Sequence, residues 1–238
     1  MRILSILTYN IAWEVSEGIS SKGIKEVCPK NNGITTCIQN IIDMLNDLFA
    51  DIEFDFVCFQ ETNKWRVIRE KTVLSEYNYF TSISDKEEMV TFWKPEIGNP
   101  SVVRGGHFSS GRPFHFLYFE DEELCLMNIH PGHDKDEFIR IEKLLEEDEL
   151  ELIDESNVII AGDFNQVPEE NVKLFSTELN GVHNIQTCCD SSLGTKKRRP
   201  FAAYDQILST GTLMESEVIV TNKYFSDHYP VWNKFNMD

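Results

Sequence analysis

Short apolar runs that end in a polar, chemically reactive residue recur along the chain. Each run has the length and the Val, Ile, Leu and Phe content of an interior β-strand. These runs are residues 3–9 before Asn10, 54–60 before Glu61, 124–129 before His130, and 159–162 before Asp163 and Asn165. Further strands are predicted at residues 90–94, 113–119, 203–208, 217–221 and 231–235.

Helical spacing appears between these strands. Ile38, Ile41, Ile42 and Leu45 share one face of a predicted helix, for which Thr35 or Thr36 is the candidate cap. Other helices are predicted at residues 62–78, 134–154 and 169–179, and residues 14–34 are predicted to form an inserted loop. A strand, a helix and a strand within the first sixty residues favour a layered α/β fold. The length of 238 residues and the absence of repeats or linkers predict a single domain, 1–238.

The charge balance narrows the possible partners. The formal net charge is −18, which argues against a protein that coats nucleic acid or an anionic membrane through bulk charge. One basic run, residues 196–199 with Lys197 and Arg198, stands out against this background. It has three interpretations: contact with a phosphate backbone, a nuclear localisation signal, or a solvated loop.

Cysteine usage and hydropathy predict an intracellular protein, cytoplasmic or nuclear and not secreted. The six cysteines form no C-x-x-C pair, so mostly free, buried thiols are expected. The first residues do not resemble a signal peptide, and no apolar run is long enough to span a membrane. We therefore expect no membrane insertion. We also expect a monomer.

The polar residues at the strand ends are all ligand or acid/base types. Asp163 and Asn165 are two positions apart, so they would project together just past a buried strand. A carboxylate and an amide there can hold a water or a phosphate oxygen and share a metal ion. By itself this segment is also compatible with an Asp/Asn turn. With Asp227 and His228 just before the last predicted strand, the chain has five such polar groups at strand ends, and five are hard to explain by turn chemistry. α/β sheets place ligand sites beyond strand ends.

The same residues carry a resemblance to a known family. The chain resembles the endonuclease/exonuclease/phosphatase superfamily of metal-dependent phosphodiesterases. The matching motifs, in family order, are Leu7–Asn10, Phe59–Glu61, Asn128–His130, Gly162–Asn165, Tyr204–Ile207 and Ser226–His228. The resemblance implies an α/β fold, a four-layer αββα sandwich of two mixed β-sheets with outer helices.

The resemblance also implies residue roles. Glu61 would be the central ligand of Mg²⁺, with Mn²⁺ as a possible substitute, and Asn10 and Asp227 would lie nearby. Asp163 would position or deprotonate the attacking water with the help of Asn165. His228 would contact the scissile phosphate, with its ring oriented by Asp205. His130 would stabilise the transition state or protonate the leaving oxygen.

Substrate choice stays open between several interpretations. Arg112 could clamp a phosphate or be an ordinary surface arginine after a glycine turn. Trp13, three residues past Asn10, could stack on a base if it is exposed. The first functional hypothesis is a magnesium-dependent nuclease or nucleic-acid-end phosphodiesterase. The second is a phosphatase or phosphodiesterase for a small molecule such as a nucleotide, an inositol phosphate or a phospholipid headgroup, which the negative net charge favours. The third is a catalytically silent binding module.

Overall fold

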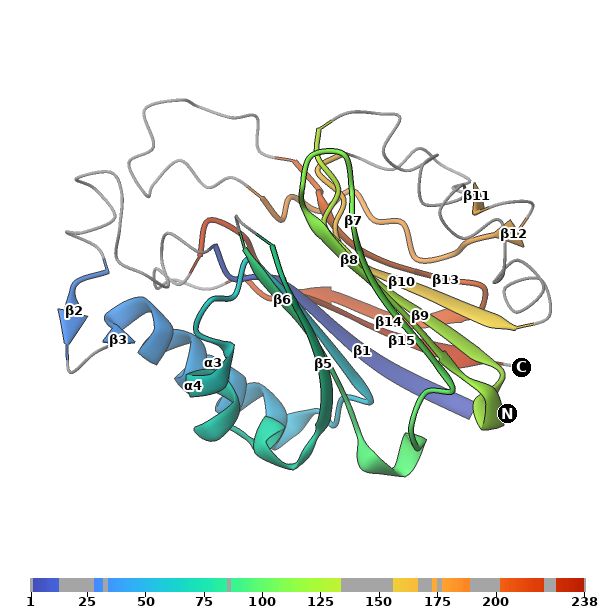
Figure 1. Ribbon diagram of the computed structural model, residues 1–238, viewed down its shortest axis with the longest axis horizontal. Coiled ribbons are helices and arrows are strands. Elements are labelled where there is room, and N and C mark those ends of the chain that lie inside the picture. Colours follow the sequence, from blue (N-terminus) through green and yellow to red (C-terminus); the bar gives the residue numbers. More distant parts are fainter. Residues whose placement is uncertain are drawn as a thin grey trace.

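Two β-sheets packed face to face form the centre of the molecule (Figure 1). A computed structural model describes residues 2–12, 28–31, 34–84, 87–133, 156–166, 173–174, 177–188, 202–220 and 226–237. Fold and site are described below for these residues.

The first sheet has six strands in the order β14-β15-β1-β4-β6-β5. Their bounds are β1 Arg2–Asn10, β4 Phe56–Gln60, β5 Asn78–Ile83, β6 Glu88–Trp93, β14 Thr212–Val218 and β15 Val231–Met237. The sheet is mixed, because β1 pairs parallel with β4 while its other neighbour, β15, is antiparallel. The two strands with the most complete apolar runs, β1 and β4, lie side by side in its interior.

The second sheet has five strands in the order β13-β10-β9-β8-β7. Their bounds are β7 Val102–His107, β8 Pro113–Phe119, β9 Leu124–Ile129, β10 Asn157–Asp163 and β13 Asp205–Ser209. This sheet is also mixed, since β9 and β10 are parallel and the other pairs are antiparallel. The mixed two-sheet sandwich predicted for the fold is therefore confirmed.

Helices α3 (Thr36–Asp51) and α4 (Trp65–Glu70) lie on the outer side of the first sheet (Figure 1). The Thr35 hydroxyl caps α3 by accepting a hydrogen bond from the Ile38 amide, as the sequence predicts. The apolar face of α3 packs on outward-facing residues of β1, β4 and β6. Three short 3-10 helices, Val73–Glu76, Pro95–Ile97 and Glu120–Glu122, complete the connections around the sheets. Among helices in the described residues, none combines the length and apolarity required to cross a membrane.

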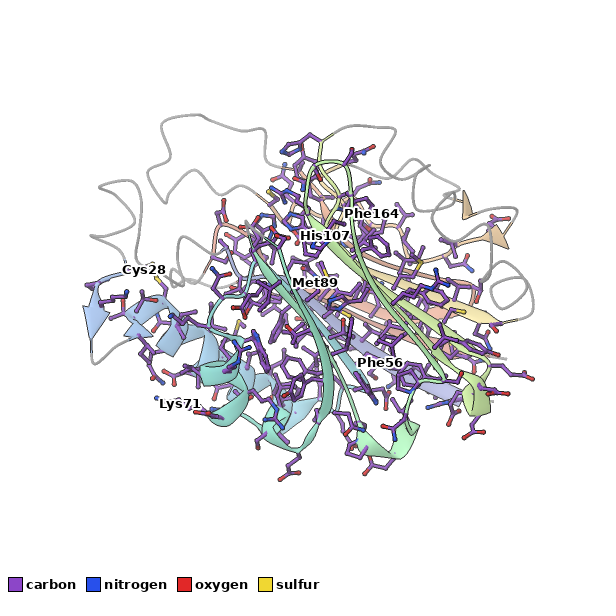
Figure 2. All side chains as sticks on the ribbon, in the orientation of Figure 1. Cys28, Phe56, Lys71, Met89, His107 and Phe164 are labelled. Carbon is purple, nitrogen blue, oxygen red and sulfur yellow. A yellow bond between two sulfur atoms is a disulfide. The ribbon has the colours of Figure 1, made fainter. Side chains whose placement is uncertain are left out.

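Apolar side chains fill the space between the sheets (Figure 2). Phe56 and Cys58 of β4 face Leu117 of β8 and Leu126 of β9, and all four are fully buried. Burial of this kind stabilises the sandwich by roughly 25 cal/mol for each Å² of apolar surface removed from water. The polar ends of the strands project beyond this core at one edge of the sandwich.

Several predicted boundaries were wrong. Edge strands β5 and β7 were missed, and the helix predicted at 62–78 is only the single turn-and-a-half of α4 followed by a 3-10 turn. The helix predicted at 169–179 is contradicted where the chain is described, because β11 (Lys173–Leu174) pairs with β12 (Thr177–Glu178). The helix predicted at 134–154 and most of the 14–34 loop lie outside the described residues.

The cysteine prediction was only partly right. Cys58 and Cys125 are buried thiols that form no disulfide. Cys28 and Cys37, however, form a disulfide that ties the short β2–β3 hairpin (Lys30–Asn31 and Ile34–Thr35) to the start of α3. Cys188 is disulfide-bonded as well. The two cysteines of the first pair are nine residues apart and flank a turn, a proximity that the sequence pattern alone did not reveal.

Candidate active site

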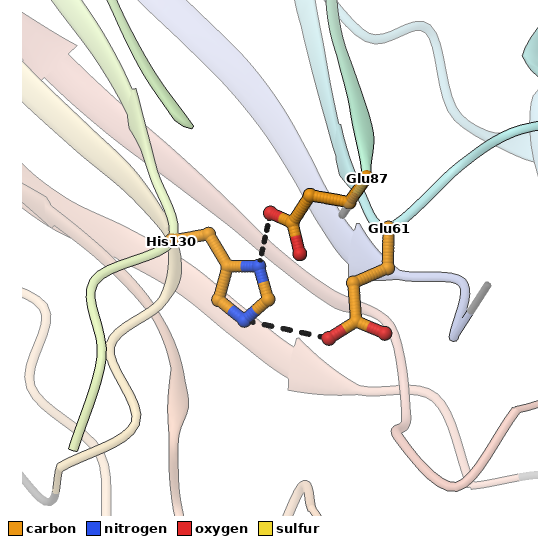
Figure 3. Close-up of side chains that lie close together, drawn as sticks. All are labelled: Glu61, Glu87 and His130. Atoms are coloured by element: carbon orange, nitrogen blue, oxygen red, sulfur yellow. Dashed lines mark hydrogen bonds and ion pairs between the residues drawn. The ribbon is translucent and has the colours of Figure 1, made fainter. Parts of the chain in front are cut away.

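Three side chains from the two sheets converge at one edge of the sandwich (Figure 3). His130 follows β9 in the second sheet, whereas Glu61 follows β4 and Glu87 precedes β6 in the first. The His130 Nδ1 atom lies 2.7 Å from Glu87 Oε1, and its Nε2 atom lies 3.6 Å from Glu61 Oε1. The His130 ring is completely buried and Glu87 is nearly so. The ring is therefore held between two carboxylates, one on each nitrogen.

Asp163, at the end of β10, links this group to a second one. Its Oδ2 atom accepts a hydrogen bond of 2.9 Å from Asn10 Nδ2 and lies 3.3 Å from His130 Nε2 and 3.7 Å from His228 Nε2. Asn10 comes from the first sheet and His130 from the neighbouring strand β9, so Asp163 faces both sheets. One carboxylate oxygen thus lies between two imidazoles.

His228 and Asp205 form the second histidine–carboxylate pair. The His228 Nδ1 atom lies 2.8 Å from Asp205 Oδ2, and its Nε2 atom lies 3.4 Å from Cys188 Sγ and 3.7 Å from Asp163 Oδ2. Asp205 starts β13 and pairs in register with Asp163 of β10. The hydroxyl of Ser226 accepts a hydrogen bond from the His228 amide and donates one to the Asn10 carbonyl, which fixes the loop before β15.

The backbone at the strand ends adopts conformations that non-glycine residues rarely take. Glu61 has φ 50° and Asn165 has φ 51°, both in the left-handed region. Side chains alternate between the two faces of the sheet up to Gln60. This alternation ends at Glu61, so the Glu61 side chain does not have to point to the face opposite that of Gln60. A Cβ at Gly162 would collide with the carbonyl oxygen of Ile129, so glycine there lets β10 approach β9 closely. Such local strain is concentrated where side chains must be aimed at a site.

The protonation equilibria follow from burial and charge. Burial lowers the pKa of His228, but the charges of Asp205 and Asp163 together raise it well above its ordinary value. Burial likewise opposes the charged form of His130, and Glu87 and Asp163 raise its pKa. Burial would raise the pKa of Asp163, yet the positive charges of His228 and His130 lower it. These directions favour the charged forms of both imidazoles beside an ionised aspartate.

The pKa of Glu61 shifts in the direction opposite to that of Asp163. Burial raises the pKa of its carboxyl, although the positive charges of His130 and Arg112 oppose the shift. Arg112 lies in the loop before β8, and its Nη1 atom is 3.5 Å from Glu61 Oε1. The arginine predicted as a possible phosphate clamp therefore lies at the rim of the site, with 25% of its side chain exposed.

The remaining predicted site residues have different locations. Asp227 is partly exposed, and its Oδ1 atom is 4.0 Å from His228 Nε2. Asn165 donates from Nδ2 to the carbonyl of Pro131, so it fastens the loop that follows His130. Trp13, Lys197 and Arg198 lie outside the described residues. Asn10, Glu61, Arg112 and the other described candidates all meet at this edge.

Glu87 is a residue of the site that the sequence analysis missed. The search followed polar residues at the ends of strands, but Glu87 precedes β6. Because β6 runs antiparallel to β4, its start lies at the same edge of the sheet as the end of β4. The signal that could have revealed it is an acidic residue just before an antiparallel strand.

The donor atoms of the site fit a divalent cation. Two clusters bring three ligand atoms within 4.8 Å of one another: Glu61, Glu87 and His130, and Asp163, Asp205 and His228. The buried His130 Nε2 atom has no hydrogen-bond partner. Carboxylate and amide oxygens are the ligands that Mg²⁺ prefers, and Glu61 supplies such an oxygen in the first cluster. A cation at Glu61 would neutralise an anionic ester and polarise its phosphorus–oxygen bond.

The arrangement combines two oriented imidazoles, an ionised aspartate and an arginine around one point. An imidazolium can donate to a phosphate oxygen or to a leaving oxygen, and a carboxylate can orient or deprotonate water. The carboxylate partner on each Nδ1 fixes the ring and favours its charged form, as in hydrolytic triads. These are the parts required for hydrolysis of a phosphate ester.

Sequence comparison shows the family. The profile of the endonuclease/exonuclease/phosphatase family matches residues 7–228, which include every motif of the site. The chain belongs to this family. A curated relative, uncharacterized protein L684 of Acanthamoeba polyphaga mimivirus, is 29% identical over 258 residues. That match covers 95% of this chain and 49% of L684, so the chain spans about half the length of this relative.

Solved structures of the endonuclease/exonuclease/phosphatase family share the fold. A family protein from Leptotrichia buccalis is 18% identical with a TM-score of 0.66, and the match covers 98% of this chain and all of that one. TDP2 of D. rerio, in complex with a single-strand DNA product, is 16% identical with a TM-score of 0.64 and 99% coverage of both chains. At these identities the similarity establishes the fold alone.

Proposed function

We propose that this protein is a magnesium-dependent phosphodiesterase that hydrolyses phosphate ester bonds in nucleic acid, as a nuclease or an end-processing enzyme. Family membership supports hydrolysis of a phosphate ester. The observation that carries the proposal is the position of Asp163, whose Oδ2 atom lies between the Nε2 atoms of His130 and His228. A water held by Asp163 would face a phosphate that the two imidazolium groups can bind.

In this proposal each residue has its own role in the hydrolysis of one phosphate ester. Asp163 orients the attacking water and accepts its proton. His228, held by Asp205, donates a hydrogen bond to a non-bridging oxygen. His130, held by Glu87, stabilises the charge of the leaving oxygen or protonates it. Glu61, with Asn10 and Asp227, would hold Mg²⁺, and Mn²⁺ is expected to substitute.

The nucleic-acid substrate is supported by the fold neighbour TDP2, which was solved with a single-strand DNA product. Arg112 at the rim supplies a local positive charge suited to a phosphate. The alternative substrate is a small phosphorylated molecule, and the net charge of −18 favours it because a short substrate needs only a local basic pocket. Salt dependence distinguishes the two, since affinity for nucleic acid falls steeply with salt.

The proposal is tested by hydrolysis assays with single-stranded and double-stranded DNA and RNA, 5′-blocked DNA ends, inositol polyphosphates and nucleotides. Cleavage of a nucleic acid that requires Mg²⁺ and is lost in Asp163→Asn supports the proposal. Turnover of small phosphates alone would replace it with the phosphatase alternative. Metal binding by a folded protein without any turnover would favour the silent binding module.

The intracellular location stays a prediction. The reduced thiols of Cys58 and Cys125 agree with a reducing compartment, but the Cys28–Cys37 disulfide is typical of an oxidising one. Cysteine usage therefore no longer supports the cytoplasmic or nuclear location.

A further inference from the structure

A layer of buried polar side chains separates the apolar interface of the two sheets from the active site. We call it the polar layer. Its members are Thr8, Gln60, Thr91, His115 and Asn128, and none of them has any exposed area. Inward-facing positions of a sandwich are normally apolar, and polar groups there are costly unless they are hydrogen-bonded. The polar layer therefore requires an explanation beyond packing.

The polar layer lies directly below the part of the site that contains Glu61 and His130. Asn128 lies on β9 two residues before His130, which directly follows the strand, so the two side chains face the same side of the sheet. Gln60 is the last residue of β4 and directly precedes Glu61, where the backbone turns into the left-handed region. Any movement of Asn128 or Gln60 is thus transmitted to His130 or Glu61 through one or two peptide units.

Asn128 is the centre of the polar layer. Its Oδ1 atom accepts a hydrogen bond of 2.8 Å from Gln60 Nε2 in the opposite sheet. Its Nδ2 atom donates to Thr91 Oγ1 at 3.0 Å and to the Val90 carbonyl at 3.1 Å, again across the interface. Gln60 Nε2 also lies 3.1 Å from Thr8 Oγ1 in the first sheet. One amide from the second sheet is therefore tied to two strands of the first.

His115 extends the polar layer to the edge of the sandwich. Its Nδ1 atom lies 2.9 Å from Thr91 Oγ1 and its Nε2 atom 2.8 Å from Ser82 Oγ. Burial lowers the pKa of His115 to about 3, so the ring is neutral. A neutral imidazole has one donor and one acceptor, which two hydroxyl groups can satisfy.

The active site needs such a device because its parts come from different sheets. Glu61 and Glu87 belong to the first sheet and His130 to the second. Apolar contacts are non-directional and allow small sliding, whereas hydrogen bonds fix distance and angle. We propose that the polar layer, centred on Asn128, is a positioning device that fixes His130 relative to Glu61 and Glu87. Its effects on catalysis and on metal binding rest on the proposed function, while its effect on the His130 environment does not.

Two nearly isosteric substitutions test the device in the full chain. Asn128→Leu and Thr91→Val remove cross-sheet hydrogen bonds and keep the number and branching of the side-chain heavy atoms. We expect each to raise the Mn²⁺ dissociation constant about tenfold and to lower kcat about 10- to 100-fold, with KM within about threefold. Thr91→Ser keeps the hydroxyl and is expected to stay close to the wild type. The wild type and all variants are compared at a temperature where denaturation curves show them folded.

Leu117→Ala, in the apolar part of the same interface, is the control for general loosening of the core. It should lower stability without changing Mn²⁺ affinity or kcat. The histidine ring resonances of the metal-free protein give a readout that needs neither metal nor substrate: Asn128→Leu should shift those of His130, and Leu117→Ala should not. Unchanged His130 resonances and Mn²⁺ affinity in both Asn128→Leu and Thr91→Val would overturn the proposal. A wild type that binds Mn²⁺ without turnover would instead contradict the proposed function, and the resonances and metal titration would still decide the role of the polar layer.

Discussion

Removal of the Glu87 charge should impair catalysis without unfolding the protein. Glu87 Oε1 lies 2.7 Å from His130 Nδ1, and both groups are buried. In Glu87→Gln the side-chain oxygen can still accept a hydrogen bond from Nδ1, but the negative charge that raises the pKa of His130 is lost. The imidazolium form of His130 should therefore be less populated at neutral pH.

The size of this effect follows from the strength of the interaction. A hydrogen bond to a charged group contributes about 1.5–3 kcal/mol, and each 1.4 kcal/mol corresponds to a factor of ten. We expect kcat at saturating substrate and Mg²⁺ to fall about 10- to 100-fold in Glu87→Gln. Glu87→Ala should fall further, because the ring also loses its orientation. KM should change little in both variants.

The neighbouring residue provides a matched control. Glu88 accepts a hydrogen bond from Trp65 Nε1 and pairs with Arg66 on the helix side of the first sheet. Glu88→Gln should leave kcat unchanged. Circular dichroism and urea unfolding would establish that all three variants are folded. A kcat for Glu87→Gln within twofold of the wild type would refute the assigned role of Glu87.

Three further predictions concern stability and binding. The pKa of His115 is about 3 in the folded state, so the unfolded state binds more protons between pH 3 and about 6.5. The free energy of unfolding should therefore fall as the pH decreases through this range, by up to about 1.4 kcal/mol per pH unit. In urea unfolding, His115→Gln should abolish this part of the pH dependence. Gly162→Ala should destabilise the protein by at least about 2 kcal/mol, because the Cβ of the alanine would collide with the Ile129 carbonyl. An unchanged urea midpoint would contradict the close approach of β10 and β9. Arg112→Gln should raise KM about tenfold. Its Mn²⁺ affinity, measured by calorimetry, should stay equal or increase, because the guanidinium competes with a cation for Glu61. Weaker Mn²⁺ binding would exclude that competition.

The sequence predicted the interior of the fold better than its edges. Strands β1, β4, β9 and β10 are buried on both faces, so they appear as continuous apolar runs that any reading of hydropathy detects. Edge strand β7 contains Arg104, Gly105 and Gly106 and is largely exposed, so it has neither an apolar run nor a clear alternation. Its strand conformation comes from pairing with β8, which is a tertiary effect.

The site could be predicted where its residues end an apolar strand. Asn10, Glu61, His130 and Asp163 were found in this way, and the structure brings them together. Glu87 could not be found, because its place in the site depends on the antiparallel direction of β6. The polar layer was hidden for a similar reason. Its hydrogen bonds join residues far apart in the chain, such as Gln60 and Asn128, and only the packing of two sheets brings them into contact.

The most direct test of the account is hydrolysis of a single-stranded DNA substrate in Mg²⁺, with and without EDTA, by the wild type and by Asp163→Asn. The account predicts cleavage by the wild type that EDTA abolishes and that the variant loses by a factor of about 10²–10⁴, the range for a general base. Cleavage that persists in EDTA, or a folded Asp163→Asn variant with wild-type activity, would contradict it.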